Sequence, residues 1–182
     1  MKYCAVLKKK LSVLILFLLV TVLPAMADDD GRHDMKNMQV TIDAVKYKSS
    51  RFIEKEIIKE KEYIKGKSSS YNKNGEANVG RLLQPSAEYI INTKLPGGTY
   101  IITVFYQIDK EKAPESPKVA IGINTQQPQE IEIKNKLVNS VKASFNVNFF
   151  KGKKHTVKVF FPSEGVKIRE IKVVRALIPK KK

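Results

Sequence analysis

The chain lacks several residues on which common functional sites depend. Its 182 residues include no tryptophan, two histidines and one cysteine, Cys4, which precedes an N-terminal apolar run. A folded domain without cysteine has no disulfides, thiol chemistry or cysteine-ligated metal. The histidines, His33 and His155, are far apart in the sequence, and no nucleophile is marked beside His155, which we assign to the surface or to a strand end. The composition therefore argues against an enzyme, and neither a cofactor nor a metal site is expected.

Residues 1–27 have the pattern of a cleaved secretory signal. Lys2 and Lys8–Lys10 precede the apolar run Leu11–Leu23, and Ala25-Met26-Ala27 forms an A-x-A site before the following aspartates. The run is short for a membrane span, so an uncleaved anchor is the less favoured alternative. We expect export to the periplasm or out of the cell. The remaining chain then divides into a flexible leader (28–37), one folded domain (38–177) and a basic tail (178–182).

Charge is the most unusual property of the composition. The chain has 34 basic and 18 acidic residues, which gives a net charge of +16. Such an excess favours polyanions, for example acidic polysaccharide or an anionic envelope surface. Lysine also keeps exposed strands soluble, and the sequence leaves both explanations open. The predicted polyanion-binding surface comes from one late hairpin and comprises Lys151, Lys153, Lys154 and Lys158.

Nucleic acid is not an expected partner. Aromatic residues do interleave with the basic residues of the late hairpin, which a single-strand-binding surface would require. At strand spacing, however, the four phenylalanines of this region are assigned to the core, and export also argues against a nucleic acid. These residues are Phe149, Phe150, Phe160 and Phe161.

Alternating apolar and polar residues predict an all-β domain. The clearest strand runs from Val141 to Phe149, and Thr99–Gln107 is apolar on both faces, as a central strand is. Turn signals such as Pro96-Gly97-Gly98 separate seven or more short strands, which predicts an antiparallel β-sandwich. The segment Phe52–Ile64 is ambiguous, because its Glu/Lys interleaving suits a helix and its apolar pairs suit two strands. We favour strands there, since everything around it is β.

The order of the motifs resembles the galactose-binding-like jelly roll of family 6 and family 35 carbohydrate-binding modules. The resemblance is carried by the first strand Val40–Ala44, Leu95-Pro96-Gly97-Gly98-Thr99-Tyr100, Val119–Asn124, the hairpin Val147–Val157 and the last strand Val166–Val174. It implies a jelly-roll sandwich and glycan recognition by a non-catalytic domain. The sequence also departs from those modules. It has no tryptophan to grip a sugar, and Ile42-Asp43-Ala44-Val45 keeps only one acid of the family's calcium-binding strand.

The best ligand site visible in the sequence is the polar loop 68–78. An aromatic face under a pyranose ring and amides for its hydroxyls are the chemistry of sugar binding. Tyr71 supplies the ring, and Asn72, Asn74 and Asn78 supply the amides. Asn, Gly and Ser are also ordinary turn residues, and Tyr71 covering the core is the alternative. The leading hypothesis is a carbohydrate-binding domain, with acidic glycans as one option. The alternative is a structural or adhesion subunit that binds another envelope protein.

Overall fold

A computed structural model of the chain describes residues 32–36, 38–78, 84–93, 98–134, 139–147 and 154–176. The predicted signal, the basic tail, Lys151 and Lys153 lie outside these residues, so those predictions stay untested. The described chain consists of strands and one short 3-10 helix, Ser68–Ser70. Within these ranges, none of the helical structure has the length and apolar character that a membrane span requires.

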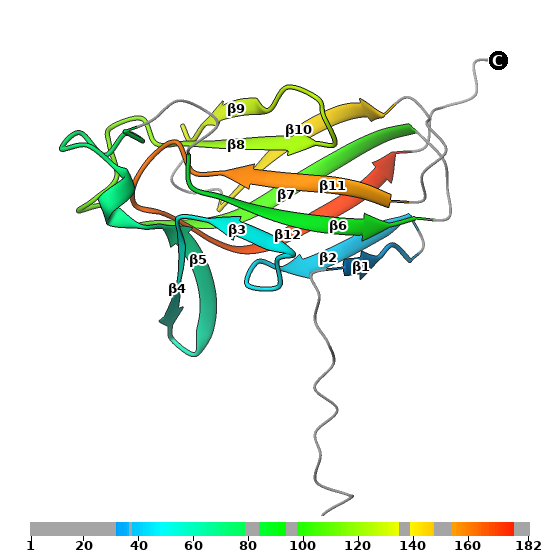
Figure 1. The fold of residues 1–182 in the computed structure, drawn as a ribbon, viewed down its shortest axis with the longest axis horizontal. Coiled ribbons are helices and arrows are strands. Elements are labelled where there is room, and N and C mark those ends of the chain that lie inside the picture. Colours follow the sequence, from blue (N-terminus) through cyan, green and yellow to red (C-terminus); the bar gives the residue numbers. More distant parts are fainter. Residues whose placement is uncertain are drawn as a thin grey trace, which may run out of the picture.

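Two six-stranded sheets face each other (Figure 1). Sheet A has the order β1-β6-β11-β8-β9, and β3 pairs with β6 beside β1. Its strands are β1 (Arg32–Asp34), β3 (Ser49–Arg51), β6 (Ser86–Asn92), β8 (Lys118–Ile123), β9 (Gln129–Glu132) and β11 (Lys154–Phe160). All its pairings are antiparallel except that of β1 with β6.

Sheet B has the order β10-β7-β12-β5-β4, and β2 pairs with β12 beside β5. Its strands are β2 (Gln39–Asp43), β4 (Ile53–Ile58), β5 (Lys61–Gly66), β7 (Gly98–Ile108), β10 (Ser140–Val147) and β12 (Val166–Ala176). The pairing of β12 shifts between Ile168 and Glu170, where β5 ends its contact and β2 begins its own. A bulge at that point bends the strand and lets two partners share one edge.

The core lies between the sheets and follows the predicted alternation. Val157 and Val159 of sheet A and Ile102 and Val173 of sheet B are fully buried. β7 lies between β10 and β12, which confirms the prediction of a central strand. The antiparallel sandwich is confirmed, and Phe52–Ile64 forms two strands, not a helix.

The β4–β5 hairpin extends away from the body of the sandwich (Figure 1). Its turn is made by Lys59 and Glu60, which both have left-handed backbone angles, φ 48° and 64°. Two left-handed residues give the turn whose twist matches that of the paired strands, although glycine or asparagine normally occupies it. Because the hairpin lies outside the core, Ile57 on it is 70% exposed, and Phe52 at its base is 46% exposed.

Residues Arg32–Asp34 form a strand where the sequence predicts a flexible leader. They pair in parallel with Ile90–Asn92 of β6, and Met35 packs against the core. The three polar residues of this segment show no alternation that predicts a strand. The segment is β only because it pairs with β6.

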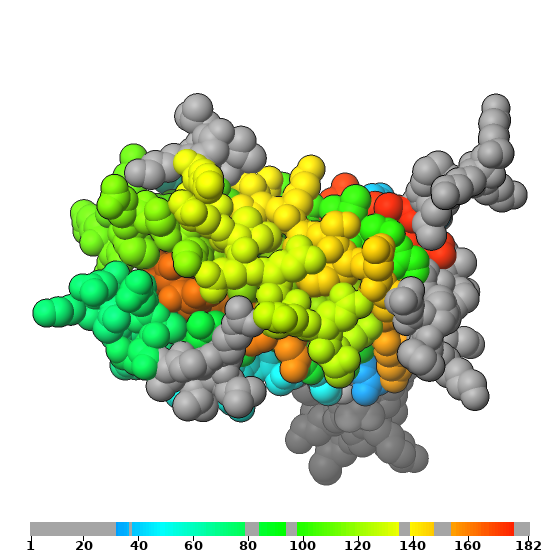
Figure 2. Space-filling view, turned by 90° about the horizontal axis from the view of Figure 1, so that it is seen from above, coloured from blue at the N-terminus to red at the C-terminus, as the bar shows by residue number. Residues whose placement is uncertain are grey.

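The two sheets are also linked along one side, where β9 and β10 lie next to each other (Figure 2). The side-chain amide of Gln129 donates to the carbonyl of Ser144 at 2.7 Å, and that of Gln126 donates to the carbonyl of Asn146 at 2.7 Å. These bonds tie the turn between β8 and β9 and the first residue of β9 to the edge strand of sheet B.

Candidate functional site

Tyr71 does not offer the exposed platform that the sequence predicts. Its ring is 8% exposed and lies against Gly66, and its hydroxyl donates to the carbonyl of Phe161 at 3.2 Å. Burial raises the pKa of the phenol, with a smaller contribution from Glu164. A sugar ring cannot reach this face, so Tyr71 fastens the loop to the end of β11 and the prediction is corrected.

The three asparagines of the loop have different surroundings. The Asn72 side-chain oxygen accepts from the backbone nitrogens of Asn74 at 2.9 Å and Glu76 at 3.0 Å, so it shapes the loop. Asn74 and Asn78 are exposed. The loop is anchored to the turn after β11 through the backbone bond from Ala77 to Pro162. A binding role for the exposed amides stays a prediction.

The two described lysines of the predicted polyanion surface share one face of β11. Lys154, Thr156, Lys158 and Phe160 alternate with buried residues, so their side chains point outward from sheet A. Lys154 is exposed at the start of the strand, whereas Lys158 lies near its end beside Phe160. The structure thus places Lys158 in a hollow that the sequence did not predict.

Strand register gathers a set of outward side chains across sheet A. Residues directly opposite each other in a ladder lie on the same face. Pairing aligns one row across β3, β6, β11, β8 and β9: Arg51, Ser86, Phe160, Ala120 and Glu130. A second row runs parallel to it: Ser49, Glu88, Lys158 and Gly122. Because serine, alanine and glycine are small, the surface of the sheet is hollowed between the larger side chains.

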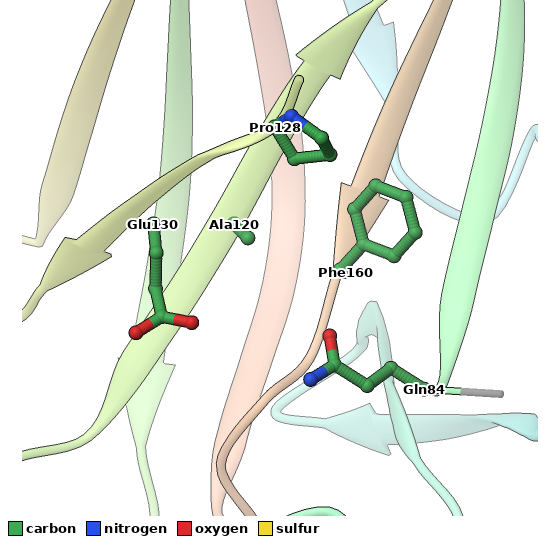
Figure 3. A pocket seen from close by; sticks show the side chains of 5 residues that line it. All are labelled: Gln84, Ala120, Pro128, Glu130 and Phe160. Carbon is green, nitrogen blue, oxygen red and sulfur yellow. The ribbon is translucent and has the colours of Figure 1, made fainter. Parts of the chain in front are cut away.

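Two adjoining hollows on this face share Pro128 and Phe160, and together we call them the sheet A groove. The turn between β8 and β9 forms the wall on one side and β3 lies on the other. Figure 3 shows the smaller hollow, where four larger side chains surround Ala120. The groove is lined by Ser49, Ser50, Arg51, Gln84, Ser86, Glu88, Ala120, Gly122, Asn124, Thr125, Gln126, Pro128, Glu130, Lys158 and Phe160.

Phe160 is the residue that the sequence analysis missed. The sequence assigned it to the core, but it is partly exposed on the outer face, while Val159 and Phe161 on either side are fully buried. Successive strand residues point to opposite faces, so Phe160 and Phe161 cannot both face inward. If Val157 and Val159 point inward, Phe161 does so too, and the ring of Phe160 must then point outward.

Three charged side chains of the groove, Glu88, Lys158 and Glu130, form ion pairs, the last with Lys118 at the start of β8. The Lys158 ammonium lies 2.9 Å from a Glu88 carboxylate oxygen, and Lys118 donates to Glu130 at 2.9 Å. The hydrogen bond with Glu130 raises the pKa of Lys118. Partly exposed pairs of this kind add little to stability. They present both donors and acceptors, which is what the hydroxyl groups of a sugar require.

The wall formed by the β8–β9 turn is held from inside the sandwich. Asn124, which lines the groove, has its side-chain nitrogen 3.2 Å from Nδ1 of His155. His155 is 6% exposed, so of its two predicted positions the surface is wrong and the strand end is confirmed. It occupies the second position of β11 and points between the sheets. Burial lowers its pKa.

The site contains the groups of a binding surface. Within the described ranges, no three histidine, cysteine, aspartate or glutamate side chains are grouped so as to hold a metal ion. The groove combines an aromatic ring, a proline ring and small hydroxyl residues with charged pairs. Such a surface can stack on apolar faces and exchange hydrogen bonds.

Solved structures with the same fold include carbohydrate-binding modules. The C-terminal family 6 module of a marine laminarinase from Zobellia galactanivorans superposes with a TM-score of 0.52 at 16% identity, over 75% of this chain and 99% of the module. A family 35 module from Clostridium thermocellum gives 0.50 at 14% identity, over 76% and 98%. A family 6 module of lichenase 5A from Cellvibrio mixtus, in complex with cellotriose, gives 0.51 at 11% identity, over 76% and 98%.

No protein-family model matches the chain, and no curated protein sequence is similar to it. The superpositions confirm the jelly-roll fold of family 6 and family 35 modules. Identities of this size show the fold and leave the ligand to be argued from the chain's own residues.

Proposed function

We propose that the protein is an exported, non-catalytic carbohydrate-binding domain that holds a glycan in the sheet A groove. The observation that carries the proposal is the partly exposed ring of Phe160 beside Pro128 in a hollow lined by polar side chains. The similar modules bind carbohydrate by name, and one was solved with cellotriose, which supports the same class of ligand. Export is supported by the signal pattern of residues 1–27.

The chemistry of the groove suits a sugar ring in two ways. The C–H face of a pyranose packs on an aromatic ring, and its hydroxyls need donors and acceptors in the surrounding wall. Phe160 supplies the ring, and the Glu88–Lys158 pair lies one row away on the same face. The groove therefore does without the tryptophan that the chain lacks.

A preference for acidic glycans is the narrower part of the proposal. It is supported by the net positive charge, which is still +12 without the four lysines of the predicted signal, and by Lys158, which lines the groove. Lys158 already forms an ion pair with Glu88, so the carboxylate or sulfate of a glycan must compete with Glu88 for its ammonium group. Binding of an acidic glycan should weaken as salt rises, whereas stacking on Phe160 should resist salt.

The decisive experiment is isothermal titration with cellohexaose and laminarihexaose as neutral probes and polygalacturonate as the acidic probe. Phe160→Ala should weaken binding by about 2 kcal/mol or more, roughly thirtyfold, as loss of a central aromatic contact does. Phe105→Ala, which removes a partly exposed ring from sheet B, is the matched control and should bind as the wild type does. Equal binding by the wild type and Phe160→Ala would show that the glycan lies elsewhere.

A second function, binding to another envelope protein, is favoured by the β4–β5 hairpin. β4 is an edge strand in the described sheet, and Ile57 on it is 70% exposed. Edge strands and exposed apolar residues are typical of protein docking by strand addition. Crosslinking in the native envelope should capture one discrete partner through a photoreactive residue at position 57, and none from the same residue at position 73. Capture of the same proteins from both positions would contradict this function.

A further inference from the structure

The groove wall is linked to a buried histidine through one asparagine. Asn124 begins the turn between β8 and β9, in a left-handed conformation with φ 53°, and its side chain lies between groove and core. The backbone nitrogen of Thr156 donates to the Asn124 side-chain oxygen at 3.0 Å. Since a backbone N–H can only donate, this contact fixes which end of the amide is oxygen.

The orientation of the amide fixes the state of His155. The Asn124 nitrogen lies 3.2 Å from Nδ1 of His155 and can only donate to it, so Nδ1 accepts and Nε2 carries the proton. The imidazole is therefore neutral at this contact. Nε2 is buried and has no hydrogen-bond partner among the described residues.

The described residues around His155 provide little stabilisation for a second proton on its imidazole ring. Among the described residues, Tyr100 of β7 is a titratable residue that faces the imidazole, with ring centroids 5.0 Å apart, and its own buried hydroxyl also has no partner there. Ile91 is the position opposite His155 on β6, and Phe145 of β10 and Arg175 of β12 are opposite Tyr100. Burial is the cause of the lowered pKa of His155.

We infer that His155 is a positioning residue for the sheet A groove, and that its protonation in mild acid rearranges the β8–β9 turn and weakens glycan binding. A proton on Nδ1 would face the Asn124 side-chain nitrogen, and two donors cannot bond each other. If the amide rotates to accept from Nδ1, the Thr156 nitrogen loses its acceptor. Either change disturbs the start of a turn that also carries Gln126 and Pro128 into the groove.

This inference rests on the proposed function for its effect on binding, but the coupling itself needs no ligand. NMR titration of the labelled, ligand-free protein, from pH 7.5 down to the acid limit of the folded state, follows the His155 ring, the Asn124 side-chain amide and the Thr125 and Gln126 backbone amides. All should move with one midpoint, and the turn signals should stay fixed in His155→Asn. A His155 titration that leaves Asn124 and the turn unchanged would overturn the coupling.

His155→Asn is chosen because its side-chain oxygen can occupy the place of Nδ1 and still accept from Asn124, while the amide does not titrate. If that variant does not fold, Asn124→Asp supplies the opposite test. A carboxylate at position 124 favours the protonated ring, so the midpoint for His155 should lie at higher pH than in the wild type. An unchanged midpoint would contradict the inferred contact.

The binding arm uses cellohexaose and laminarihexaose at pH 7.5 and at a pH below the His155 midpoint found by NMR. Wild-type affinity should fall about fivefold or more on acidification, and the fall in His155→Asn should be less than about twofold. His33→Asn, which removes the chain's other histidine, should keep the wild-type response. The same loss in wild type and His155→Asn would overturn the inference. If neither these probes nor polygalacturonate binds at pH 7.5, the proposed function fails, and the NMR result still decides the coupling.

Discussion

The sheet A groove and the β4–β5 hairpin both expose apolar side chains, but they differ in shape and in what surrounds those side chains. Phe160 lies in a hollow between hydroxyl, amide and charged groups, whereas Ile57 lies on a projecting strand. A concave surface can enclose a small ligand, and a projecting edge can meet only another surface. Exposure of an apolar residue therefore predicts a partner only together with its surroundings.

The two regions also use ion pairs differently. At the base of the hairpin, Lys167 donates to Glu56 at 2.8 Å and lies 3.3 Å from Asp109, with 11% of its side chain exposed. In the groove, the Lys158 side chain is 42% exposed and pairs with Glu88 at 2.9 Å. The first network joins β4, β12 and the end of β7, and the second faces the ligand site.

The largest expected effect comes from breaking the hairpin network. Lys167→Ala leaves Asp109 without its cation and should lower the free energy of unfolding by about 2 to 3 kcal/mol, because a largely buried pair loses one partner. Lys158→Ala is the matched control and should cost less than about 1 kcal/mol. Urea unfolding measures both. Equal losses would show that burial does not distinguish the two pairs.

Acid should separate the two regions by the pH at which each is weakened. Burial lowers the pKa of His155 below 6.5, so its contribution to stability is complete above that pH and is lost as pH falls through the folded value. Lys167 and then Lys65 lower the pKa of Glu56 below 4.5, so the hairpin contribution is lost in more acidic solution.

Unfolding midpoints measured between pH 7.5 and pH 3 should therefore fall in two steps. His155→Asn should remove the first step, and Glu56→Gln should remove part of the second. A single step that both variants leave in place would contradict this assignment, because it would mean that other groups control acid stability.

The fold was more predictable than the site, for physical reasons that particular residues show. Val157 and Val159 alternate with Thr156 and Lys158, so strand and face follow from period alone. The pairing of Arg51 with Ser86 and of Ser86 with Phe160 joins residues far apart in the chain, and no local pattern predicts it. The composition of the loop 68–78 led to the prediction of a ligand site there. Tyr71 of that loop is in fact buried and lies against Gly66.

Tyr71→Phe tests that correction with a smaller effect. Removing the hydroxyl leaves the Phe161 carbonyl without this donor and should cost about 1 kcal/mol of unfolding free energy. Glycan affinity in the titration experiment should stay unchanged, because the ring has no exposed face. Lost affinity with unchanged stability would restore Tyr71 as a ligand residue.

Substitution at the exposed tip of the hairpin should have the smallest effect. Ile57→Thr keeps a β-branched side chain on the strand. Because Ile57 is 70% exposed, the free energy of unfolding should change by less than about 0.5 kcal/mol. Glycan binding should also be unaffected, because Ile57 is not among the residues that line the groove. Only capture of an envelope partner should depend on this side chain. If Ile57→Thr weakened glycan binding as Phe160→Ala does, groove and hairpin would belong to one recognition surface, and the distinction between them would fail.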